Sequence, residues 1–171
     1  MKTVTRTIAF GLLAILAGCG EAPTPAVTAP VEEAGGWVLA SDPGEAVGVL
    51  EAKRGAPEGA EVMVRGRIGG RKAPMTLGSP VFVIMDLSLE HCDVSTEGCP
   101  TPWDYCCETP ETITTHAATV QLVGAGGEPL EGDPLGALDE LDEVIVVGTV
   151  APRPNPDVLT IRATGVYRVT H

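Results

Sequence analysis

Basic side chains are scarce in this chain, which carries 11 Lys and Arg against 23 Asp and Glu and has a formal net charge of −12. None occurs between Lys72 and Arg153, a stretch of 80 residues that holds 14 acidic ones. Because clustered Lys and Arg supply most of the affinity for phosphates, we predict no nucleic-acid partner. The short basic group Arg65, Arg67, Arg71 and Lys72 is interpreted as a solvated strand face.

Several catalytic signatures are also missing. The chain has no Gly-x-Ser-x-Gly elbow, no P-loop, no Gly-x-Gly-x-x-Gly turn and no Cys-x-x-Cys pair. It offers no nucleophile–base pair that would support a hydrolase. We therefore predict a protein that is not an enzyme and that has no resident cofactor.

The apolar run near the N-terminus is too short to span a membrane. It extends over nine residues, from Ile8 to Leu16, whereas a spanning helix needs about 20. Basic residues precede the run, and Leu16-Ala17-Gly18-Cys19 ends it. This is the layout of a secretory signal peptide, which we assign to residues 1–18.

The same tetrad resembles a bacterial lipobox. The resemblance implies that Cys19 carries acyl chains such as palmitate and becomes the new N-terminus, so that a lipid membrane is the first partner. Each buried methylene contributes about 0.8 kcal/mol, and several chains suffice for stable anchoring. We expect a location in the cell envelope that faces the periplasm. Gly20 follows Cys19 in place of an aspartate, which favours the outer membrane.

The rest of the chain divides into a tether and one domain. Residues 19–36 are rich in Pro, Ala, Thr and Glu and show no apolar period, which is typical of a disordered tether. Residues 37–171 are long enough for a single core. Aromatic residues are few (two Trp, two Tyr, two Phe), so this core must be built mainly of aliphatic side chains.

The patterns in the domain predict a mainly β fold. We expect a helix from Ser41-Asp42-Pro43 to Gly55, a shorter helix over 134–141, and five strands over 61–68, 80–87, 117–123, 143–150 and 158–169. Glycines inside these strands, such as Gly66, indicate bulges or tight bends.

This order of elements matches the OB-fold, a five-stranded Greek-key barrel with a helix between the third and fourth strands. The run Val62-x-Val64-x-Gly66-x-Ile68, followed by Phe82-x-Ile84-x-Asp86, resembles the first hairpin of bacterial OB domains. Another small barrel or a sandwich is the alternative. The fold hosts many functions and therefore assigns none.

An insertion over 88–116 separates the second and third strands. A connection of 29 residues without internal structure is unusual in a compact domain, so something must order it. It contains the run Cys99-Pro-Thr-Pro-Trp-Asp-Tyr-Cys-Cys107, which is similar to one in uncharacterised exported bacterial OB-like lipoproteins. That resemblance implies no activity.

Two disulfides are the first interpretation of the insertion. It holds an even number of cysteines, and the expected compartment is oxidising. A bond between adjacent cysteines would close a small strained ring, so we expect Cys92 and Cys99 each to pair with one member of the Cys106-Cys107 pair. Three pairings are possible in principle.

A metal site is the second interpretation. Thiolate and imidazole ligands suit zinc or cuprous copper. The candidate ligands are His91, Cys92, Cys99, Cys106 and Cys107. The spacing is not that of a standard zinc knuckle. Thiol redox chemistry is a third interpretation, which neighbouring acids such as Asp104 disfavour because they raise thiol pKa values.

Trp103, Asp104 and Tyr105 form a candidate ligand surface. Aromatic side chains stack on ligands at OB faces, although a Trp beside cysteines also serves as the core of its own loop. His91 and His116 flank the insertion. The sequence thus predicts a lipid-anchored OB-like module that binds an envelope protein or a small ligand, with metal binding as the alternative.

Overall fold

The computed structural model describes residues 36–92 and 99–170. The expected signal peptide, the lipidated Cys19 and all but the end of the tether lie outside these residues. Within them, no helix has the length and apolar character needed to cross a membrane.

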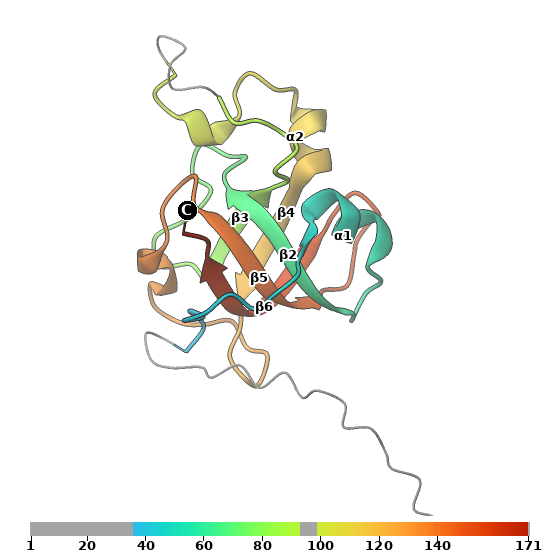
Figure 1. Ribbon diagram of the computed structural model, residues 1–171, viewed down its shortest axis with the longest axis vertical. Coiled ribbons are helices and arrows are strands. Elements are labelled where there is room, and N and C mark those ends of the chain that lie inside the picture. Colours follow the sequence, from blue (N-terminus) through green and yellow to red (C-terminus); the bar gives the residue numbers. More distant parts are fainter. Residues whose placement is uncertain (1–35, 93–98, 171) are drawn as a thin grey trace, which may run out of the picture.

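The described residues form a closed five-stranded barrel (Figure 1). The strands are β2 (Glu61–Ile68), β3 (Val81–Met85), β4 (Ala117–Leu122), β5 (Glu143–Val150) and β6 (Thr160–Arg168). They are hydrogen-bonded in the order β2-β3-β4-β6-β5, and β5 pairs with β2 to close the barrel. The β4–β6 pair is parallel and the other barrel pairs are antiparallel. This is the strand order of the OB-fold, so the expected fold is confirmed.

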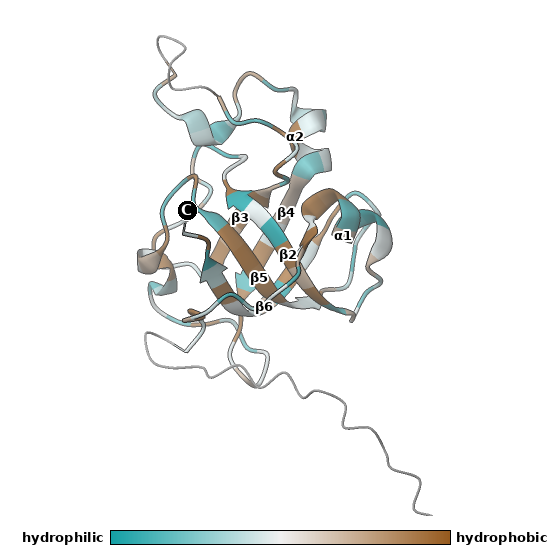
Figure 2. Cartoon of the chain, in the orientation of Figure 1, coloured by the Kyte–Doolittle hydropathy of each residue, from teal (hydrophilic) through white to brown (hydrophobic). Residues whose placement is uncertain are grey.

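Alternation along the strands places one set of side chains inside the barrel. In β2, Val64 and Ile68 are fully buried, whereas Arg65 and Arg67 point outward and are half-buried. Hydrophobic colour runs along β5 in Figure 2, whereas the upper part of β2 alternates. The core is aliphatic apart from Trp37 and Phe82, as the composition predicted.

The glycines inside the strands permit close backbone approaches. The β5–β6 register shifts between Val147 and Gly148, which is the irregularity expected of a bulge. A Cβ on Gly66 would lie 2.8 Å from the carbonyl oxygen of Met85. A side chain at that position would therefore push β3 away from β2.

The two expected helices are shorter than their patterns indicated. The helix expected from Ser41 is α1, which covers only Val49–Gly55, and Val47–Gly48 (β1) pairs with β2 instead. The helix expected over 134–141 is one 3-10 turn, η2 (Pro134–Ala137). Its apolar positions nevertheless reach the core, because Leu135 and Leu138 are both buried.

Tertiary contact with Asp86 decides where α1 begins. Oδ2 of this carboxylate accepts a hydrogen bond from the N–H of Leu50 at 2.8 Å, and Oδ1 accepts from the N–H and hydroxyl of Ser88. Gly48 leaves room for it, since a Cβ there would lie 2.9 Å from Oδ2. Burial acts to raise the pKa of Asp86, but these hydrogen bonds outweigh it and hold the pKa below its ordinary value.

Replacing Asp86 with asparagine should destabilise the barrel by about 1–3 kcal/mol at neutral pH, because the helix N-terminus loses its charged acceptor. A carboxyl whose pKa is lowered on folding stabilises the protein above its unfolded pKa of about 4, and this stability is lost as the pH falls through its folded pKa. Asp86→Asn should therefore also flatten the acid limb of the stability profile. Urea unfolding at pH 7 and pH 3 measures both effects. The exposed Glu51→Gln is the control, and equal midpoints for the two variants would contradict the assigned role.

Candidate functional site

The insertion between β3 and β4 packs on the outside of the barrel, at one end in Figure 1. A second hydrophobic cluster joins Val83, Met85 and Tyr105, with Leu89 and Ile113 packed against it. Neighbouring residues on a strand face opposite sides. Val83 and Met85 therefore point away from Phe82 and Ile84, which belong to the barrel core.

The insertion contains local structure of its own. The 3-10 turn η1 covers Pro102–Asp104, and the helix α2 covers Pro110–His116. We did not expect α2, although Thr109-Pro110-Glu111 is a typical helix start. The Thr109 hydroxyl caps it by accepting from the N–H of Thr112 at 3.1 Å. At its other end, Lys53 Nζ donates to the carbonyl oxygen of Thr114 at 2.7 Å.

Tyr105 corrects the expected ligand surface. Its side chain is fully buried, and burial raises its pKa, so it cannot stack on a ligand in solvent. The residue adopts a left-handed backbone (φ 57°) that turns the chain inward after η1. Trp103 is half-buried, and its Nε1 donates to the carbonyl oxygen of Lys72 at 3.2 Å. Tyr105 is therefore part of the core of the insertion, whereas Trp103 does not belong to that buried cluster.

The dipeptide Gly69-Gly70 receives this core directly after β2. The N–H of Gly70 donates to the carbonyl oxygen of Trp103 at 2.7 Å. A Cβ on Gly69 would lie 2.6 Å from that oxygen and 2.9 Å from the ring of Tyr105. Only glycine admits so close an approach. The paired glycines were the signal in the sequence that the insertion docks here.

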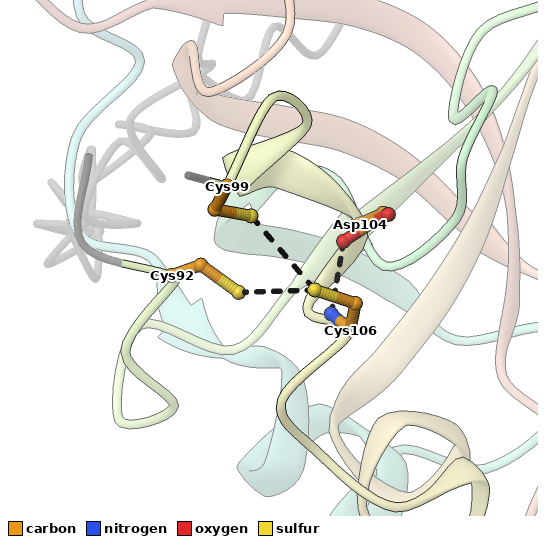
Figure 3. A group of neighbouring side chains, drawn as sticks. All are labelled: Cys92, Cys99, Asp104 and Cys106. Carbon is orange, nitrogen blue, oxygen red and sulfur yellow. Dashed lines mark hydrogen bonds between the residues drawn. The ribbon is translucent and has the colours of Figure 1, made fainter. Parts of the chain in front are cut away.

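Three cysteines and one aspartate converge beside η1 (Figure 3). Cys106 Sγ lies 3.9 Å from Cys92 Sγ and 3.8 Å from Cys99 Sγ. One ligand atom from each of Cys92, Cys99, Asp104 and Cys106 lies within 4.8 Å of all the others. We refer to these four residues as the thiol–carboxylate cluster.

Asp104 holds the cluster together through hydrogen bonds to its neighbours. Its Oδ2 accepts from the Thr101 hydroxyl at 2.8 Å, and its Oδ1 accepts from the N–H of Cys106 at 2.9 Å. Burial acts to raise its pKa, but these bonds lower it below the ordinary value. A carboxylate oxygen has more than one lone pair, so both atoms can still accept a cation.

The cluster differs in two respects from the set of metal ligands expected from the sequence. Asp104 belongs to the cluster, although we had assigned it to the ligand surface. His91 and Cys107 lie outside the cluster, and His116 places Nδ1 2.8 Å from the carbonyl oxygen of Thr112 in its own helix. Spacing along the chain could not show that Asp104 points toward the cysteines.

The two expected disulfides are not present in this structure, since Cys92, Cys99, Cys106 and Cys107 are all free. Their positions nevertheless follow the expected preference. Cys92 Sγ lies 3.5 Å from Cys107 Sγ, and Cys99 Sγ lies 3.8 Å from Cys106 Sγ. Each of the first two cysteines thus has a different member of the adjacent pair beside it.

The thiols shift one another's protonation. The Cys99 and Cys92 thiols and the Asp104 carboxylate raise the pKa of Cys106 far above its ordinary value. A hydrogen bond with the Cys92 thiol raises the pKa of Cys107. Burial acts to raise the pKa of Cys92, but hydrogen bonds from Cys107 and its neighbours lower it.

A cavity of about 200 Å³ lies beside the insertion on the outer face of β3 and β4. Val83 and Thr119 come from these strands, and Ile113 comes from α2. The β2–β3 and β5–β6 loops contribute Arg71 and Asp157. In OB-folds this face and these two loops are where ligands bind.

Comparisons with known proteins give this chain no family. No protein-family model matches the chain, and no curated protein matches it in sequence. The chain is similar in structure to the hypothetical protein ygiW from E. coli, at 15% sequence identity and a TM-score of 0.39, covering 74% of this chain and 91% of that one. It is also similar to a "putative aspartyl-tRNA synthetase" from Leishmania major Friedlin, at 13% identity and a TM-score of 0.38, covering 72% of this chain and 20% of that one. The chain thus spans about a fifth of the synthetase, and the fold assignment rests on the strand order alone.

Proposed function

We propose that this protein is a non-enzymatic, lipid-anchored envelope module that binds one thiophilic metal ion at the thiol–carboxylate cluster. Cys92, Cys99 and Cys106 supply three sulfurs, and Asp104 supplies the fourth ligand. The spacing of the sulfurs supports the proposal most directly. Sulfurs that each lie about 2.3 Å from a tetrahedral Zn²⁺ are about 3.8 Å apart. Cys106 Sγ lies 3.8 and 3.9 Å from its two partners.

The donor set favours zinc over cuprous copper. Both ions accept thiolates, but cuprous copper prefers soft sulfur or thioether ligands throughout, whereas zinc also accepts a carboxylate oxygen. Cys106 is exposed, and Cys99 and Asp104 are half-buried. One side of the cluster is therefore open to solvent, which suits an ion that is taken up and passed on.

The lipid anchor at Cys19 is proposed from the lipobox-like sequence. Cys19 would hold the domain at the membrane, and the tether would let the cluster meet ions or an envelope protein in the periplasm. The excess of acidic residues, which is larger still once Lys2 and Arg6 are removed with residues 1–18, would attract cations toward it by long-range electrostatics.

Metal binding is tested on the mature chain, residues 19–171, purified with its thiols reduced and with Cys19 acylated. Zn²⁺ and Cu⁺ are titrated separately, and Co²⁺ serves as a spectroscopic substitute because thiolate ligands give it intense charge-transfer bands. We expect the protein to bind one equivalent of Zn²⁺ with a higher affinity than Cu⁺. We also expect bound Co²⁺ to show thiolate charge-transfer bands. Absence of a bound ion at stoichiometric concentration would overturn the proposal.

A second candidate function rests on the cavity on the outer face of β3 and β4. We infer that it takes a ligand about the size of a free amino acid, because its volume is about 200 Å³. Arg71 and Asp157 offer the opposite charges that a zwitterion requires. An NMR titration with free amino acids tests this. Shift changes confined to Val83, Ile113 and Thr119 would support it, and unchanged spectra would exclude it.

A further inference from the structure

The four thiols of the insertion are arranged for oxidation into one particular pair of disulfides. Cys92 has Cys107 beside it at 3.5 Å, and Cys99 has Cys106 at 3.8 Å, between sulfur atoms. The alternative of Cys92 with Cys106 starts from a similar separation of 3.9 Å. It would, however, leave Cys99 to pair with Cys107, and no hydrogen bond joins those two sulfurs in the described residues, whereas one joins each sulfur pair of the first arrangement. The third pairing would require the strained ring between Cys106 and Cys107.

We propose that a disulfide donor oxidises these residues to Cys92–Cys107 and Cys99–Cys106, and that this oxidation releases the metal. The proposal rests on the proposed function, because it describes how the same site is regulated. Cys107 distinguishes the oxidation of the site from its metal binding. It lies outside the metal-binding group but nearest to Cys92, so it serves as the oxidation partner and not as a ligand.

The chemistry balances in two thiol–disulfide exchanges. In each, one cysteine thiolate attacks the donor disulfide, forms a mixed disulfide and releases one donor thiol. The second cysteine then attacks the mixed disulfide, closes the protein disulfide and releases the second donor thiol. Two donor disulfides take up four electrons and become four thiols. One of the four protons comes from Cys107 and three come from solvent, because the three ligating sulfurs are already thiolates.

Metal release follows from the loss of ligands. The two disulfides consume all three sulfur ligands, and Asp104 alone cannot hold a thiophilic ion. Exposure makes the reaction accessible, since Cys106 and Cys107 are both exposed. In an oxidising compartment, a bound ion would in turn protect the thiolates from the donor. Whether the site holds a metal ion or two disulfides would therefore depend on how much metal ion and how much oxidant are available.

The test uses the mature acylated chain, residues 19–171, loaded with Zn²⁺ and then treated with excess oxidised glutathione. Zinc release is followed with a chromophoric chelator, and free thiols are counted by mass after alkylation. We expect the release of the bound zinc to coincide with the loss of all four thiols. Retention of zinc after the thiols are lost would overturn the inference, as would persistence of the thiols in the metal-free protein.

Variants that keep only two of the four cysteines determine the pairing. Cys99→Ser with Cys106→Ser leaves Cys92 and Cys107, and Cys92→Ser with Cys107→Ser leaves Cys99 and Cys106. Both should form a disulfide. Cys92→Ser with Cys106→Ser leaves Cys99 and Cys107, which should stay reduced, and its oxidation at the same rate would overturn the pairing. If the reduced wild type binds no zinc, the proposed function fails, while these variants still decide the pairing.

Discussion

Serine in place of Cys106 is expected to weaken Zn²⁺ binding by at least about 100-fold, since loss of even a second-shell partner costs about 10–100-fold. Cys106 is the residue whose sulfur lies near both other sulfurs, at 3.9 Å from Cys92 and 3.8 Å from Cys99. A hydroxyl is a much poorer zinc ligand than a thiolate. Competition against a chelator of known affinity measures the change.

Cys107→Ser is the matched control, because it removes the adjacent and equally exposed thiol from outside the cluster. It should change zinc affinity by less than about 10-fold, below the range for a second-shell partner. Asp104→Asn should weaken binding by about 10–100-fold. The amide loses the charge, and its single oxygen can accept only one of the two hydrogen bonds that come from the Thr101 hydroxyl and the Cys106 N–H. An equal loss in Cys106→Ser and Cys107→Ser would show that Cys107 is a ligand, and the assignment of Asp104 would be wrong.

Alanine in place of Tyr105 should give the largest loss of stability, about 3–5 kcal/mol, because it removes a fully buried aromatic ring and leaves a cavity. Tyr105 joins η1 to Val83 and Met85 on the outside of the barrel. Its loss should detach the insertion first. The rate at which an alkylating reagent modifies the four thiols should therefore rise together with the fall in the urea midpoint.

Tyr105→Phe separates packing from the hydroxyl. It keeps the ring and should leave both the midpoint and the alkylation rates near those of the wild type. If Tyr105→Ala leaves the thiols as slowly modified as in the wild type, the insertion is held by other contacts. The contact of the insertion with Gly69-Gly70 would then be the main candidate for what holds it in place, since the N–H of Gly70 donates to the Trp103 carbonyl oxygen.

Local patterns accounted for the barrel and for little of the site. The alternation of Val64 and Ile68 with Arg65 and Arg67 predicted the inward face of β2, because strand period and burial are properties of a few consecutive residues. The start of α1 was missed because Asp86, 36 residues away, accepts from the N–H of Leu50 in its first turn. Sequence reasoning placed that start at Ser41, where Asp42 instead accepts from Gly44 in a turn.

The sequence by itself determined the order of strands, the position of the insertion and the residues able to bind a soft metal. Each depends on periodicity, glycine placement or residue type, which can be read without knowing which segments meet. Only the tertiary structure decided that Tyr105 is core, that Asp104 joins Cys92, Cys99 and Cys106, and that His91 does not. These outcomes depend on how a 29-residue insertion folds back onto the outer face of β3 and β4. Contacts between residues far apart in the chain, and not local preference, control that arrangement.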